Sequence, residues 1–181
     1  DARLPDGTRV HAVLACIADR TCLSLRVPAR TRFALDEWVE RGSLTGLGAG
    51  VLRGLVAGRA ALLVSGGTGS GKTTLLASLL GEVDPAERLV IVEDSRELDP
   101  RHPHVVRLEG RTANAERVGS VTLTDLVRNA LRMRPDRLVV GEVRGAELAD
   151  LLAALNTGHE GGCGTVHANS AESVPARLEA L

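Results

Sequence analysis

A glycine-rich segment carries the clearest chemical signal in this chain. Residues 66–74 read Gly66-Gly67-Thr68-Gly69-Ser70-Gly71-Lys72-Thr73-Thr74, which fits the pattern of a glycine, any four residues and then Gly-Lys-Ser/Thr. Such a loop binds a polyphosphate through backbone N–H groups, and glycine leaves these groups uncovered and allows positive φ angles. We therefore predict a nucleotide site in which Lys72 contacts the β- and γ-phosphates and the Thr73 hydroxyl binds Mg²⁺.

The segments around this loop have the character that a phosphate site needs. An apolar run at 60–64 precedes the loop, and an apolar, helix-compatible stretch at 75–80 follows it. A strand, a glycine loop and a helix in this order place the phosphates at a helix N-terminus, where unpaired N–H groups and the helix dipole favour an anion. The alternative is a flexible glycine turn with Lys72 as an ordinary surface lysine, and it does not account for a strand and a helix on the correct sides.

Polar residues follow three of the later apolar runs. Four strands are expected after the glycine loop, at 89–92, 105–108, 138–140 and 164–167, and the apolar runs at 89–92 and 138–140 predict strands that are buried on both faces. The first strand ends in Glu93 and Asp94, the third leads to Glu142, and the fourth ends in His167. Because the carboxyl ends of parallel strands meet at one edge of a sheet, these groups should lie beside the glycine loop.

Hydrolysis of a γ-phosphoryl group needs a metal, a carboxylate that orients water and positive groups near the developing charge. The predicted edge supplies all three types, but each residue also has a plain structural interpretation. Glu142 could form only a salt bridge with Arg144, and Glu93 could be a solvated strand-end acid. His167 could be a satisfied structural histidine.

One position departs from the general plan of phosphate-loop proteins. The second acidic motif of such proteins usually ends its strand in Asp followed by Glu, with the Asp near Mg²⁺. Here the Asp position is Gly141, and only Glu142 remains. We therefore expect Mg²⁺ to depend on Thr73 and Glu142, the nucleotide and water, with help from Glu93 or Asp94.

Composition limits the other classes of protein. The chain has 181 residues, of which 44% are hydrophobic and 25% charged, and its net charge is −1. This is typical of a globular protein with no global attraction to nucleic acid. Three cysteines without a Cys-x-x-Cys pair indicate free thiols in a reducing compartment. No run is long enough to span a membrane, no signal peptide is visible, and the chain is expected to be a fragment of a longer protein.

Periodicity and turn residues predict the remaining elements. We expect strands at 9–17 and 21–27, a short helix at 35–41, and a helix-like or loop segment at 44–58. Further helices are expected from the Thr122 cap to Pro135, at 146–157, and from Ser170 to the end. Strands that alternate with helices predict an α/β fold with a mostly parallel sheet flanked by helices. We assign residues 1–42 to the C-terminal part of an N-terminal domain, 43–59 to a linker, and 60–181 to a nucleotide-binding core.

Four ordered motifs resemble those of the secretion ATPases that power type II secretion, type IV pilus assembly and type IV secretion. Residues 66–74 resemble the phosphate loop of this family, and Glu93-Asp94-Ser95-Arg96-Glu97-Leu98 resembles its aspartate box. Residues 131–145, with Gly141-Glu142-Val143-Arg144, resemble its second acidic motif. Gly158-His159-Glu160-Gly161 and Gly164-Thr165-Val166-His167 resemble its histidine box. The likeness covers residue 5 to the end and is strongest to the branch serving tight-adherence pili and related conjugal-transfer systems.

The resemblance implies a RecA-like P-loop NTPase core, truncated at its C-terminal end and preceded by a fragment of a smaller α+β domain. It implies that ATP and Mg²⁺ bind at Lys72 and Thr73, that Glu142 acts on the attacking water, and that Glu93 supports this site. It further implies that His167 senses the γ-phosphate and that an N-terminal arginine reaches a nucleotide site. Arg26, in Leu25-Arg26, is the best match for that arginine, with Arg30 and Arg32 as weaker candidates. Each of the three could instead be a solvated surface arginine.

The function that the resemblance implies is an ATP-hydrolysing motor of a secretion or pilus assembly machine. Such a motor is a homohexameric ring, cytoplasmic and peripherally attached to platform proteins of the inner membrane. Two alternatives stay open. One is a nucleic-acid translocase with the same engine, favoured only by the local cluster Arg128, Arg132, Arg134 and Arg137. The other is a module that binds nucleotide without hydrolysing it.

Overall fold

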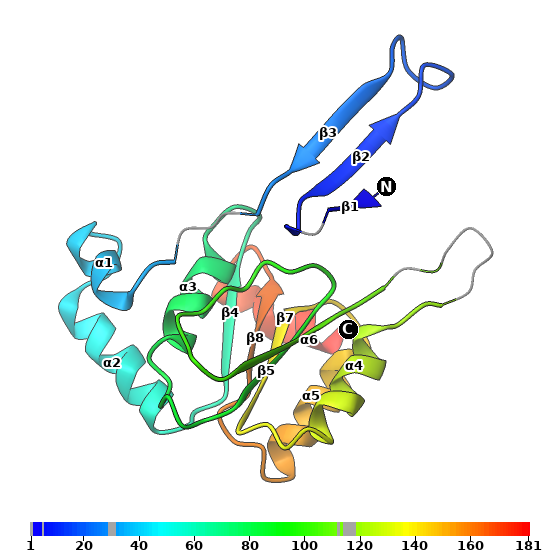
Figure 1. Ribbon diagram of the computed structural model, residues 1–181. Coiled ribbons are helices and arrows are strands. Elements are labelled where there is room, and N and C mark those ends of the chain that lie inside the picture. The colour runs from blue at the N-terminus through cyan, green and yellow to red at the C-terminus, as the bar shows by residue number, and fades with distance from the viewer. Residues whose placement is uncertain (1, 5, 29–31, 112, 114–118) are drawn as a thin grey trace.

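The fold is built around a five-stranded parallel sheet (Figure 1). A computed structural model describes residues 2–4, 6–28, 32–111, 113 and 119–181. The strands are β4 (Leu62–Gly66), β5 (Leu89–Glu93), β6 (Val105–Glu109), β7 (Arg137–Val143) and β8 (Cys163–His167), in the order β4-β8-β7-β5-β6. Every residue of β5 is buried, as a continuous apolar run in a parallel sheet requires. The predicted strands are thus confirmed, although β7 continues three residues beyond its expected end.

Helices cover both faces of this sheet. On one face, α1 (Leu35–Glu40), α2 (Gly46–Ala57) and α3 (Lys72–Leu80) pack against Leu89, Ile91 and Val139. On the other face, α4 (Leu123–Leu131) and α5 (Glu147–Asn156) pack against Val90, Val92 and Val140. Successive strand residues point to opposite faces, so the apolar runs supply both cores at once. The α/β class predicted from the alternation of elements is confirmed.

Local sequence sets where the helices begin. Thr122 caps α4 by accepting from the backbone of Asp125, whose side chain bonds back to Thr122, and this is the predicted capping box. The segment predicted as a linker contains α2, whose Ala49 and Val56 are buried in the core. The last helix begins later than expected, because the 3₁₀ turn η1 (Ala171–Ser173) precedes α6 (Val174–Glu179).

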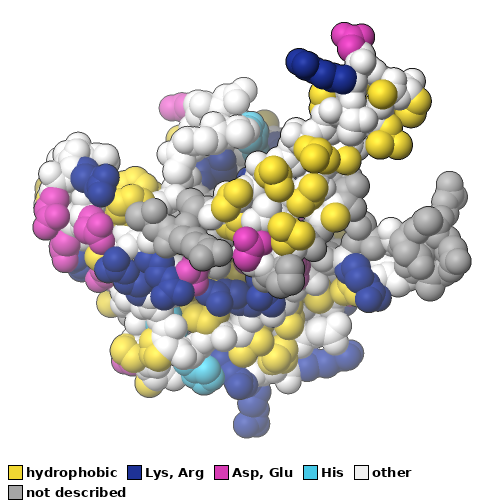
Figure 2. Space-filling view, turned by 45° about the horizontal axis from the view of Figure 1, so that its top comes forward, with side chains coloured by type: hydrophobic (Ala, Val, Ile, Leu, Met, Phe, Trp, Pro, Cys, Tyr) yellow, Lys and Arg dark blue, Asp and Glu magenta, His cyan; other side chains and the backbone are white. Residues whose placement is uncertain are grey.

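A small antiparallel sheet forms the N-terminal part of the chain and projects from the core (Figure 1). It consists of β1 (Ala2–Arg3), β2 (Arg9–Val13) and β3 (Cys22–Arg26). The predicted hairpin is present, with shorter strands than expected. Arg9 pairs with Arg26, and Val10 pairs with Leu25, so the hairpin has one face with arginines and one with apolar side chains. Figure 2 shows the apolar side chains gathered along the hairpin, where Leu23, Leu25 and Val27 are exposed.

Within the part of the chain that the structure describes, no helix combines the length and the apolar character that crossing a membrane requires.

Candidate nucleotide site

The glycine loop connects β4 to α3, as predicted, and two of its glycines are required by its path. Gly71 has a φ of +90°, which favours glycine because a side chain is strained there. A Cβ atom on Gly66 would lie 2.6 Å from the Ser70 Oγ, so the loop closes only around a bare backbone. Gly71 is also the N-cap residue of α3, where no side chain caps the helix. The first amides of α3 are therefore free of side-chain caps and face an anion-binding position.

Lys72 begins α3 and lies against the loop. Its Nζ donates a hydrogen bond to the Gly67 carbonyl over 2.7 Å, and the Ser70 hydroxyl donates to the same carbonyl over 2.8 Å. An ammonium group has three N–H donors, so Lys72 can donate to the loop carbonyl and to a phosphate oxygen at the same time. Lys72 is the only lysine in the sequence. The predicted phosphate loop thus has the geometry that its pattern indicates.

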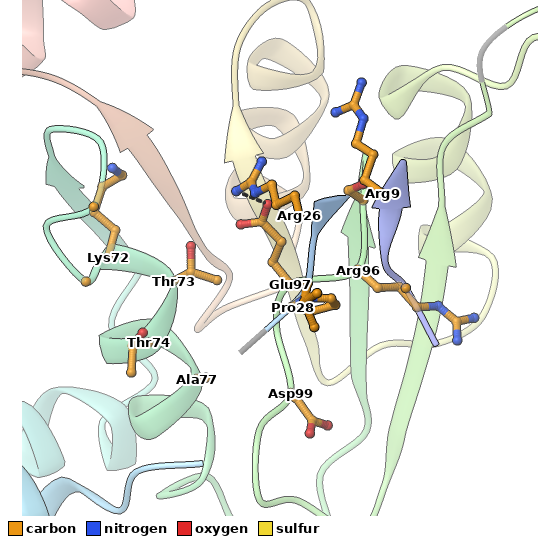
Figure 3. A pocket seen from close by; sticks show the side chains of 15 residues that line it. Arg9, Arg26, Pro28, Lys72, Thr73, Thr74, Ala77, Arg96, Glu97 and Asp99 are labelled. Atoms are coloured by element: carbon orange, nitrogen blue, oxygen red, sulfur yellow. Dashed lines mark ion pairs between the residues drawn. The ribbon is translucent and has the colours of Figure 1, made fainter. Parts of the chain in front are cut away.

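A cavity of about 380 Å³ opens beside this loop (Figure 3). One wall is the start of α3, and the opposite wall combines the N-terminal hairpin with the segment that follows β5. The lining residues are Gly7, Arg9, Arg26, Val27, Pro28, Gly69, Gly71, Lys72, Thr73, Thr74, Ala77, Ser95, Arg96, Glu97 and Asp99. The cavity has the volume of a typical small-molecule site and carries cationic groups on both walls.

A smaller cavity of about 60 Å³ joins most of the residues predicted from the strand ends. Thr73, Glu93 and Glu142 line it together with Arg26. These four residues come from α3, β5, β7 and β3. The parallel sheet therefore brings residues 49 positions apart, such as Glu93 and Glu142, to one place.

Glu93 is a buried carboxylate at the end of β5, with 4% of its surface exposed. Burial raises the pKa of Glu93 to about 7, although the backbone N–H groups of Leu98 and Glu97 oppose this rise by donating to its Oε1 over 2.9 and 3.0 Å. The group can therefore be protonated near neutral pH. It also fixes the chain that follows β5.

The packing of Glu93 explains the glycine where other phosphate-loop proteins have Asp. A Cβ atom on Gly141 would lie 2.6 Å from the Cγ of Glu93. A side chain at 141 and the present position of Glu93 exclude each other. The carboxylate beside position 141, where other phosphate-loop proteins have Asp, thus comes from Glu93 of β5 and not from β7.

Glu142 lies within β7 and is partly exposed to the smaller cavity. Its Oε2 accepts a hydrogen bond from the Arg144 Nη2, and the Arg144 Nη1 lies 3.7 Å from Asp94. The salt bridge that we considered as an alternative is present, and it does not remove Glu142 from the cavity. Its second carboxylate oxygen has no recorded partner among the described residues and can accept from water.

His167 ends β8, pairs in register with Gly66, and is exposed. It lies at the start of the glycine loop, but it is not among the lining residues of either cavity. Its assigned contact with the γ-phosphate stays a prediction.

The structure separates the three arginine candidates. Arg26 lines both cavities and pairs with Glu97 over 2.6 Å. Arg32 forms a bidentate ion pair with Asp99, at 2.5 and 2.8 Å, and holds the chain against the core. Arg30 lies outside the described residues. Of the two that the structure describes, only Arg26 faces the cavities.

Arg9 is a site residue that sequence reasoning missed. It is the cross-strand partner of Arg26 and lines both cavities. Its guanidinium has no partner among the described residues. Aligning the two predicted strands as an antiparallel pair would have placed Arg9 and Arg26 on the same face.

The donor set of the smaller cavity fits Mg²⁺. Among the described residues no cluster of three His, Cys, Asp or Glu side chains could hold a metal alone. However, Mg²⁺ is usually held by one or two protein oxygens together with phosphates and water. Thr73 and Glu142 supply such oxygens, and Glu93 and Asp94 lie in the same lining.

Sequence comparison relates the whole chain to one family. Residues 1–181 match the family model described as type II/IV secretion system protein. A putative conjugal transfer protein of Mycobacterium tuberculosis is 60% identical over 176 residues, which cover 97% of this chain and 50% of that protein. The type IV secretion system protein PtlH of Bordetella pertussis is 41% identical over 201 residues, which cover 98% of this chain and 59% of that protein.

Solved structures agree with the sequence comparison. The VirB11 ATPase of the Brucella suis type IV secretion system, in complex with sulphate, is 31% identical, with a TM-score of 0.62 over 98% of this chain and 58% of that one. The pilus retraction motor PilT with bound ADP is 26% identical, with a TM-score of 0.69 over 97% of this chain and 52% of that one. The chain therefore spans half to three-fifths of the length of these relatives.

Proposed function

Because the chain belongs to the type II/IV secretion system protein family, we propose that it is the ATP-hydrolysing motor part of a secretion or pilus assembly machine. The observation that carries the proposal is the convergence of Thr73, Glu93, Glu142 and Arg26 on one cavity beside a phosphate loop. The cavity brings together a hydroxyl that could bind Mg²⁺, carboxylates that could orient water and a guanidinium, which are the protein groups that γ-phosphoryl hydrolysis requires. The likeness to an ATPase and to a motor with bound ADP supports the same activity.

We assign a separate role in this reaction to each of several residues of the chain. The loop amides and Lys72 bind the phosphates and fix the γ-phosphoryl group. Glu142 is held by Arg144 through one oxygen, and its other oxygen orients the attacking water. Glu93 is buried and bonded to the backbone at 97 and 98, so it keeps the wall of the cavity in place.

Thr73 and Glu142 would hold a magnesium ion beside these groups. When bound, Mg²⁺ neutralises charge that develops on the phosphate oxygens. His167 stands at the start of the loop, where we propose that it senses the γ-phosphate.

The hairpin supplies the positive charge of the second wall. Arg26 lines the same cavity as Lys72, from the opposite wall, and we assign it to the phosphates. We further propose that the whole protein assembles as a homohexamer, works in the cytoplasm, and docks on platform proteins at the inner face of the cell membrane. The ring and its location follow from the resemblance to the family, and the names of the relatives support only the link to secretion and conjugal transfer.

The test is Mg²⁺-dependent ATP hydrolysis per chain across a wide range of protein concentration. A specific rate that rises with concentration supports sites completed between subunits. Glu142→Gln should bind ATP and lose most turnover, because an amide orients water less well and cannot accept its proton. Arg128→Gln, on the exposed surface of α4, is the matched control and should keep the rate of the parent protein. Unchanged turnover in Glu142→Gln would remove this residue from the mechanism.

A further inference from the structure

On the wall of the larger cavity that faces α3, an ion pair joins the N-terminal hairpin to the segment that follows β5 (Figure 3). The Arg26 Nη2 lies 2.6 Å from the Glu97 Oε1. Both side chains line the same cavity as Lys72 and Thr73. The guanidinium that we assign to phosphate, that of Arg26, is therefore already paired with the Glu97 carboxylate.

This ion pair is weak enough to be exchanged. The side chains of Arg26 and Glu97 are 70% and 38% exposed, and water screens pairs of this kind strongly. A guanidinium binds phosphate with two parallel hydrogen bonds, which makes phosphate a strong competitor for a carboxylate. An entering phosphate can thus take Arg26 from Glu97.

The position of Glu97 is fixed by its backbone and not by Arg26. Its N–H donates to the buried Glu93 Oε1 over 3.0 Å, and the next residue, Leu98, donates to the same oxygen. The backbone of Glu97 consequently stays at the cavity wall when Arg26 leaves the carboxylate, and the carboxylate remains within reach to take Arg26 back.

We propose that Glu97 is a positioning residue that competes with nucleotide phosphate for Arg26 and thereby weakens nucleotide binding. This inference rests on the proposed function, because it takes the cavity as the nucleotide site. The competition holds the hairpin against the core when no phosphate is bound, and it returns Arg26 to the core when the nucleotide leaves. Glu97 therefore favours release of nucleotide and product.

The first consequence is that removing this carboxylate strengthens binding. Glu97→Gln keeps the shape and the backbone bond to Glu93, and it removes the negative charge that holds Arg26. From the usual strength of exposed ion pairs, we expect the Kd for Mg²⁺-AMP-PNP to fall about twofold to fivefold. Isothermal titration calorimetry on the full chain measures this change.

A double-mutant cycle separates competition from simple repulsion. If Glu97 acts through Arg26, the gain in affinity for Mg²⁺-AMP-PNP from Glu97→Gln should be largely lost in an Arg26→Gln background. Asp150→Asn is the matched control, because Asp150 pairs with Arg128 over 3.2 Å on another part of the surface and its removal should leave Kd unchanged.

Three outcomes distinguish the two proposals. Tighter binding in Glu97→Gln that depends on Arg26 supports the competition. The competition alone is overturned if the parent protein binds Mg²⁺-AMP-PNP and Glu97→Gln binds it equally or more weakly. It is also overturned if Glu97→Gln raises the affinity by the same factor with and without Arg26. A parent protein that binds no nucleotide overturns the proposed function and this inference together.

Discussion

The two sheets of this chain differ in how they are held. All five residues of β5 are buried, whereas all five residues of β3 are exposed. The core sheet fixes Glu93 and Glu142 through packing on both faces. The hairpin brings Arg26 to the same cavity, where the exposed ion pair with Glu97 holds its side chain. The comparison indicates a site with a fixed half, to which we assign nucleotide binding, and an exchangeable half, which we propose responds to the nucleotide.

The largest effect on stability should come from Arg137, which begins β7 in the fixed half. Arg137 is 3% exposed and donates to both carboxylate oxygens of Glu87, over 2.8 and 3.1 Å, and to the Val56 carbonyl. Arg137→Met leaves the Val56 carbonyl without this donor and, among the described residues, leaves Glu87 with only the Arg59 guanidinium, 3.3 Å away, so we expect a loss of about 3 kcal/mol in the free energy of unfolding. Urea denaturation measures it. Arg26→Met should change stability by less than about 0.5 kcal/mol, and equal losses would contradict the division.

A pH dependence should follow from Glu93. Burial raises its pKa to about 7 in the folded protein, above the value near 4.3 of an unfolded chain. The ionised form is thus disfavoured by folding, and stability falls as pH rises from about 4.5 to 7 and is constant above that. The total is on the order of 3 kcal/mol. Urea denaturation of the parent and of Glu93→Gln at pH 5 and pH 8 checks the sign, because the variant lacks this slope.

Lys72→Ala should separate binding from folding within the fixed half. The loss of the ammonium that we assign to the phosphates should reduce hydrolysis of Mg²⁺-ATP at least about 100-fold. The fold should persist, because the loop carbonyl at Gly67 keeps the Ser70 hydroxyl as a donor. Thermal unfolding without nucleotide is the control. Turnover near that of the parent would show that the loop does not bind the reacting phosphate.

The smallest effect should come from Arg9, the arginine of the exchangeable half for which the described residues supply no partner. Arg9→Gln removes one positive charge from the cavity, and we expect about a tenfold loss of turnover with stability unchanged within about 0.5 kcal/mol. Steady-state hydrolysis and urea denaturation measure the two quantities. Arg20→Gln, at the far end of the hairpin, is the control. A loss of stability as large as that of Arg137→Met would assign Arg9 to the fold and not to the site.

Sequence patterns predicted most of the fixed half, whereas in the exchangeable half they predicted the hairpin, Arg26 came from the family resemblance, and Arg9 was missed. The loop of residues 66–74 and the buried strands carry strong local signals, and parallel strand ends meet at one edge, so Glu93 and Glu142 could be placed together. Arg9 could not be chosen by residue type, because arginine occurs throughout the surface. Likewise, the packing of Glu93 against Gly141 depends on the distance between two strands, which no local pattern contains.

The alternating faces of the hairpin also limit how this segment can change length. Arg9 and Arg26 share one face, and Leu25 lies on the other. A deletion or insertion of one residue in β3 would turn its arginine outward and put a leucine over the cavity, whereas a change of two residues would keep the faces. The tolerance of this strand to insertions and deletions should therefore follow whether their number is odd or even.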